Sequence, residues 1–92
     1  MSRRTIWKYS ILPNMNTITV PSGAKPLSVA FQGQELMVWL LVDPDASKVD
    51  RTFSIYGTGS IIPEGTEIGV FVGTTVHPTL GYVIHVFDLG EA

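Results

Sequence analysis

The sequence predicts an all-β fold: one small antiparallel sandwich or barrel-like meander of six to seven strands, with residues 1–92 as a single domain. Three observations predict this class. Six prolines and nine glycines interrupt the chain at short intervals, as in all-β domains. The segments between them are rich in β-branched and aromatic residues. No segment repeats its apolar residues at the spacing of an amphipathic helix.

Each expected strand is bounded by residues that favour turns. The expected strands, with the residues that close the first six in parentheses, are 5–11 (Pro13-Asn14), 17–20 (Pro21-Ser22-Gly23), 27–32 (Gln32-Gly33-Gln34), 35–43 (Asp43-Pro44-Asp45), 51–56 (Gly57-Thr58-Gly59), 67–72 (a loop with His77-Pro78 and Gly81) and 82–87. Pro26 opens the third strand, and Gly33 lies in a short hairpin turn. Residues 45–50 have room for one helical turn at most, because nothing apolar recurs there at helical spacing.

The strand over 35–43 has apolar side chains on both faces. Leu36, Val38, Leu40 and Val42 point one way, and Met37, Trp39 and Leu41 point the other way. Such a strand belongs in the centre of a sheet, covered on both sides. A domain of this size builds one core only, so we expect a second subunit to cover the other face in a homo-oligomer.

Composition and charge exclude several classes of protein. Hydrophobic residues make up 45% and charged residues 15%, which excludes a disordered chain. A net charge of -2 argues against nucleic acid or an acidic membrane as the partner. The longest apolar run, 36–42, is far shorter than the roughly 20 residues of a membrane-spanning helix. With no apolar leader after the basic start, we expect a cytoplasmic protein.

The residue types that enzymes and metal sites need are sparse. The chain has no cysteine, no G-x-S-x-G motif and two histidines, so we expect no catalytic residues, no metal and no cofactor. His77 precedes Pro78 and is expected in a solvated loop, and His85 is expected to be a buried or half-buried core residue. Asp43 and Asp45 fit ordinary turn chemistry.

A hypothetical ligand site combines Arg51 with the backbone of Gly57-Thr58-Gly59. A loop rich in N–H groups can form an anion-binding concavity, and an arginine grips phosphate or carboxylate with two parallel hydrogen bonds. The structural alternative is a turn that needs positive φ at Gly57 or Gly59. In that alternative Arg51 pairs with a nearby carboxylate, Asp43, Asp45 or Asp50.

Aromatic side chains complete this hypothetical site. Tyr56 or Trp7 is the expected stacking group for a purine or nicotinamide ring, and His85 the expected hydrogen-bonding group. The alternative is that these rings fill the core of the domain. Stacking on single-stranded nucleic acid is not expected, because no basic stripe accompanies the rings.

The chain resembles a family of short uncharacterised proteins encoded by bacteriophages and prophages. The residues that carry the resemblance are Ile6-Trp7-Lys8-Tyr9, Leu12-Pro13, Arg51-Thr52-Phe53-x-Ile55-x-Gly57-Thr58-Gly59-x-x-Ile62-Pro63 and His85-Val86-Phe87. The resemblance implies a phage origin and action in the cytoplasm of a bacterial host, and it implies no particular activity.

Two functions from different classes remain open at this stage. The first is a non-catalytic, oligomeric, anti-defence sponge that sequesters a nucleotide-derived immune signalling molecule between subunits. The second is a protein–protein interaction or virion accessory module without a small-molecule ligand, in which the aromatic residues form the contact patch. The sequence leaves both in place.

Overall fold

The computed structural model describes residues 3–12 and 16–92, and it confirms the all-β class. No helix occurs in these residues. The strands are β1 (Thr5–Ser10), β2 (Thr17–Pro21), β3 (Lys25–Gln32), β4 (Glu35–Val42), β5 (Lys48–Gly57), β6 (Val70–Val76) and β7 (Val83–Glu91). The turn expected at Pro13-Asn14 lies outside the described residues.

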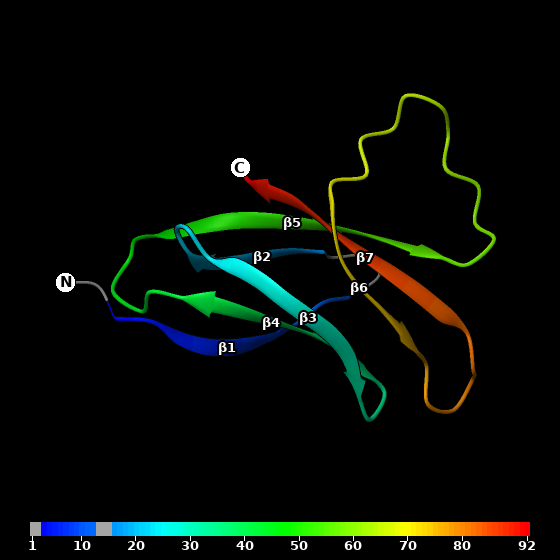
Figure 1. Cartoon of the computed structure of the whole chain (residues 1–92), viewed down its shortest axis with the longest axis horizontal. Helices are drawn as coiled ribbons and strands as arrows, with labels where there is room; N and C mark the ends of the chain where they lie inside the picture. The colour runs from blue at the N-terminus through cyan, green and yellow to red at the C-terminus, as the bar shows by residue number, and fades with distance from the viewer. Residues whose placement is uncertain (1–2, 13–15) are drawn as a thin grey trace.

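The strands form two sheets in which every neighbouring pair is antiparallel (Figure 1). One sheet has the order β1-β4-β3, and the other has the order β2-β5-β7-β6. The expectation that residues 35–43 form a central strand is confirmed, because β4 pairs with β1 on one side and β3 on the other. β7 is also interior to its sheet, between β5 and β6.

The core lies between the two sheets and follows the alternation of the strands. Leu36, Val38, Leu40 and Val42 of β4 are buried, whereas the intervening Met37, Trp39 and Leu41 are half-buried on the outer face. From the opposite sheet Val20, Phe53 and Val86 complete the core. Residues 3–12 and 16–92 form these two sheets and no third layer over the outer face of β4, so the homo-oligomer that this face suggested stays a prediction.

Several expected strand boundaries differ from the structure. β3 begins at Lys25 rather than at residue 27, β6 ends at Val76 rather than at residue 72, and β7 spans Val83–Glu91 rather than 82–87. The starts of β5 and β6 differ for local reasons. β5 begins at Lys48 rather than at residue 51, because the whole of β2, Thr17–Pro21, pairs with residues 48–52. β6 begins at Val70 rather than at residue 67. Gly69 has φ +89°, a left-handed conformation that does not belong in a strand, so the chain can enter the sheet only after it.

The edges β3 and β6, one from each sheet, run side by side and close one flank of the sandwich. At Gly73 they touch, because a Cβ there would lie 3.0 Å from Val29 Cγ2 and 3.6 Å from its backbone nitrogen. Beyond this contact the β3–β4 hairpin meets the β6–β7 hairpin through Phe31, His77 and Tyr82. The ring centroids of Phe31 and His77 are 5.0 Å apart, and those of His77 and Tyr82 are 4.7 Å apart. Toward their first residues, Lys25 and Val70, the two edges separate (Figure 1).

His77 is buried, so the expectation of a solvated loop residue is wrong. The residue is 6% exposed because the β6–β7 connection folds it against Phe31. Its Nδ1 accepts hydrogen bonds from the backbone nitrogens of Thr79 (3.2 Å) and Leu80 (3.0 Å). The ring therefore organises the hairpin loop in the way an N-cap oxygen organises a helix start.

This geometry predicts the tautomer of His77. An atom that accepts two N–H groups carries no proton, so the neutral ring must hold its proton on Nε2. Nitrogen NMR of the histidine rings should show His77 as the Nε2-protonated form at neutral pH. A proton on Nδ1 would contradict the loop geometry.

Tyr9 gives a prediction about pH. Desolvation by burial raises the pKa of its phenol above the ordinary value of 10.0. The folded state thus favours the neutral phenol, and this contribution to stability is complete below the unfolded pKa and lost as pH rises through the folded pKa. Ultraviolet titration should show one tyrosine that ionises late, and Tyr9→Phe should remove that component. An unchanged titration in the variant would refute the assignment.

Candidate functional site

The expected site residues do not form one site. Arg51 and Gly57 lie toward opposite ends of β5, where they pair with Glu91 and Ile84 of β7. Six residues of extended strand separate them by about 20 Å. A single anion cannot contact both, so the combination of Arg51 with the glycine loop is wrong.

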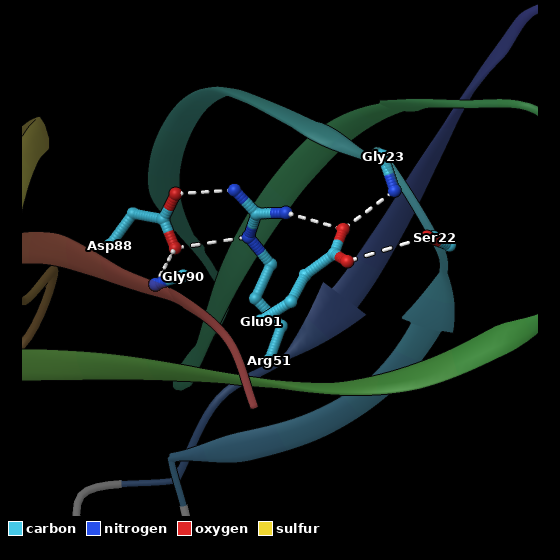
Figure 2. A network of polar contacts seen from close by, with 6 residues as sticks. All are labelled: Ser22, Gly23, Arg51, Asp88, Gly90 and Glu91. Carbon is cyan, nitrogen blue, oxygen red and sulfur yellow. Dashed lines mark hydrogen bonds and ion pairs between the residues drawn. The ribbon is translucent and has the colours of Figure 1, made fainter.

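Arg51 points between the sheets and is held by two acidic residues of β7 (Figure 2). Its Nε and Nη2 donate to the two oxygens of Asp88, at 3.0 and 2.6 Å, and its Nη1 donates to Glu91 at 3.4 Å. The Arg51 and Asp88 side chains are only 11% and 12% exposed. The idea that Arg51 pairs with a carboxylate is confirmed, but the expected partners, Asp43, Asp45 and Asp50, were wrong.

The network extends from Arg51 to the turn between β2 and β3. Glu91 accepts hydrogen bonds from the Ser22 hydroxyl and the Gly23 backbone nitrogen, and Asp88 accepts one from the Gly90 backbone nitrogen (Figure 2). Arg51 thus fastens the end of β7 to β5, and Glu91 fastens it to the turn between β2 and β3. This arrangement is a structural ion-pair network, since the Arg51 guanidinium is enclosed by carboxylates of its own chain.

The Gly57-Thr58-Gly59 segment is a turn, as the structural alternative proposed. The Thr58 nitrogen donates to the Val83 carbonyl (3.0 Å), and the Ser60 nitrogen donates to the Gly57 carbonyl (3.0 Å). Gly59 has φ +88°. Two N–H groups that an anion would need are therefore already bonded to the chain.

His85 lies on the outer face of the four-stranded sheet and not in the core. The Thr58 hydroxyl lies 2.7 Å from its Nε2, and the Thr74 hydroxyl lies 2.9 Å from its Nδ1. Tyr56 is its cross-strand partner on β5. The structure thus brings Tyr56, Thr58 and His85 together, with Gly57 and Gly59 in the adjoining turn.

The same face carries a row of aromatic rings across three strands. Tyr56 and Phe87 have centroids 6.1 Å apart, and Phe71 and Phe87 have centroids 5.6 Å apart, both in edge-to-face geometry. Trp7 is not part of this row, because it lies on β1 of the other sheet with the Lys48 ammonium 5.5 Å from its ring centroid. Of the two expected stacking residues, only Tyr56 adjoins His85.

One pocket opens where the edges β3 and β6 separate. It has a volume of about 300 Å³, and it is lined by Ala24, Lys25, Pro26, Arg51, Val70, Phe71, Val72 and Asp88. A second pocket of about 130 Å³ lies toward the β3–β4 hairpin, with Glu35 as its charged residue. Apart from Arg51, the residues of the first pocket were missed from the sequence, because β3 and β6 meet only through tertiary packing.

The connection between β5 and β6 is a long exposed loop. Residues 58–69 project beyond the strands in Figure 1, and the Ile61 side chain is 88% exposed. At its base the Ser54 hydroxyl donates to the Ile68 carbonyl at 2.6 Å. The exposed apolar side chains continue into β6, where Val70 is 73% and Phe71 57% exposed. Exposed apolar residues mark a surface of interaction where they gather into one patch, as the neighbours Val70 and Phe71 do along the chain.

Comparisons with known proteins identify a family. Within residues 3–12 and 16–92, no helix is long and apolar enough to cross a membrane, and no three His, Cys, Asp or Glu side chains gather as metal ligands. No curated protein and no solved structure matches the chain. A family model described as "Domain of unknown function (DUF7352)" matches residues 2–92. The chain therefore belongs to the DUF7352 family.

Proposed function

We propose that this chain is a non-catalytic binding protein whose ligand is another polypeptide, bound through the exposed apolar residues of the loop and of β6. The observation that carries the proposal is the exposure of Ile61, Val70 and Phe71 within one continuous stretch of chain. Long loops without secondary structure in a compact domain commonly serve in binding. An interaction module, the second of the two functions suggested by the sequence, is therefore the one that the geometry favours.

The nucleotide sponge is the weaker candidate because its anion-binding groups are occupied. Arg51 is paired with Asp88 and Glu91, and the Thr58 nitrogen is bonded to Val83. What favours a small molecule is the 300 Å³ pocket, whose size is at the lower limit of ordinary ligand sites.

The non-catalytic part of the proposal rests on the surroundings of His85. Thr58 and His85 are spaced like a nucleophile and its base. However, the second ring nitrogen meets the Thr74 hydroxyl, which cannot stabilise an imidazolium as a carboxylate does. The pair also lies on an open sheet face, where water competes for every hydrogen bond.

The cellular setting is proposed from the sequence resemblance alone. On that basis the chain is of bacteriophage or prophage origin and acts in the cytoplasm of the bacterial host, with interference in host defence as its role. The net charge of -2 is in keeping with a protein partner rather than nucleic acid.

Native mass spectrometry of the protein purified from producing bacteria tests the proposal. We expect the 10.0 kDa chain to carry a bound polypeptide, which is either another copy or a different protein. A small-molecule adduct, released intact on denaturation, would instead support the sponge. Thermal-shift assays with cyclic dinucleotides and ADP-ribose would then show a raised melting temperature. A monomer that carries neither a polypeptide nor a small molecule would refute both the interaction module and the sponge.

A further inference from the structure

The 300 Å³ pocket between β3 and β6 has the properties of a docking site for an apolar, acidic loop. Val70, Phe71 and Pro26 supply apolar walls. Among the lining residues, Asp88 balances the charge of Arg51, and Lys25 adds a positive charge; Glu91, which also bonds Arg51, is not part of the lining. The ion pairs among the described residues do not include Lys25. The pocket therefore suits an apolar side chain next to a carboxylate.

The loop over residues 58–69 has the complementary chemistry. Its charged residues are Glu64 and Glu67, and it contains no lysine or arginine. Ile61, Ile62 and Ile68 are its large apolar side chains, and Ile61 is 88% exposed, so Ile61 does not occupy the pocket of its own chain. The second pocket is a poorer match, because it is smaller and its charged residue, Glu35, would repel the loop.

We infer that Ile61 of one copy inserts into the β3–β6 pocket of a second copy, with Glu64 or Glu67 facing Lys25. This inference rests on the proposed function and names a second copy as the partner. The contact joins two different surfaces, so each copy retains one free loop and one free pocket. Such a head-to-tail contact propagates into a ring or a filament rather than stopping at a symmetric dimer.

Sedimentation with two variants and their mixture tests the inference. Ile61→Asp removes the loop anchor, and Val70→Asp places a charge at the pocket while leaving the loop intact; both positions are exposed, so the fold should tolerate them. Each variant alone should self-associate at least tenfold more weakly than the wild type. An equimolar mixture should form dimers and nothing larger, because one intact loop meets one intact pocket.

Leu80→Asp is the matched control. Leu80 is 75% exposed in the β6–β7 connection, outside both surfaces, and the variant should assemble like the wild type. The inference is overturned if the wild type stays monomeric up to millimolar concentration, if Ile61→Asp assembles normally, or if the mixture stays monomeric. A different polypeptide in the native mass spectrum, without self-association, would leave the proposed function standing and remove this inference alone.

Discussion

Gly69→Ala should destabilise the domain by roughly 3 kcal/mol, because it combines backbone strain with a steric clash. Gly69 has φ +89°, a conformation that side chains rarely adopt. A Cβ would overlap the Asp88 carbonyl oxygen and lie 2.8 Å from the carbonyl carbon and 3.1 Å from the Leu89 nitrogen. These are backbone atoms of an interior strand, so they cannot rotate away. Denaturant unfolding should show a large fall in the midpoint with an unchanged slope.

Gly65→Ala is the matched control for this prediction. Gly65 lies in the same loop with φ +84°, but no atom lies within 4 Å of the position of its Cβ. Only the conformational cost remains, about 1 kcal/mol. Equal destabilisation by the two variants would show that the contact with β7 does not matter.

Arg51→Ala should cost about 3–5 kcal/mol, since it leaves the Asp88 carboxylate buried without its partner. The two side chains are 11% and 12% exposed, so water can replace the guanidinium only in part. Glu91 would lose its 3.4 Å bond to Arg51 as well. The melting temperature should fall sharply, whatever ligand is present.

A paired replacement separates the cost of an orphaned charge from the value of the ion pair. The double variant Arg51→Met with Asp88→Leu keeps apolar volume in place and removes both charges. It should be clearly more stable than Arg51→Ala, even though it loses the bond from the Gly90 nitrogen. If the double variant were as unstable as the sum of its single replacements, the two side chains would not be coupled.

The fold class was predictable because its signals are local. Alternating apolar residues and the turn residues between them fix where strands form, and the two-faced apolar pattern of residues 36–42 predicted the central β4. The order of strands in the sheets was not predictable, because it depends on pairing between distant segments. The late start of β6 depends on the contact between Gly69 and the backbone of β7, which the sequence does not display.

The candidate site was predicted less well than the fold. The cluster of Tyr56, Thr58 and His85 follows from cross-strand pairing of β5 with β7 and agrees with residues chosen from the sequence. Arg51 was chosen for its chemistry, but its partner Asp88 is 37 residues away in the chain. The exposure of Ile61 could have been suspected, since it lies between Gly59 and Pro63 in a segment without strand alternation.

Photo-crosslinking in producing bacteria tests most directly the claim that the exposed loop binds a polypeptide. A photoreactive amino acid would replace Ile61, with the same replacement of Leu80 as the control. We predict a covalent adduct heavier by the mass of a polypeptide from position 61, and none from position 80. The absence of an adduct at position 61, or equal adducts at both positions, would contradict the claim.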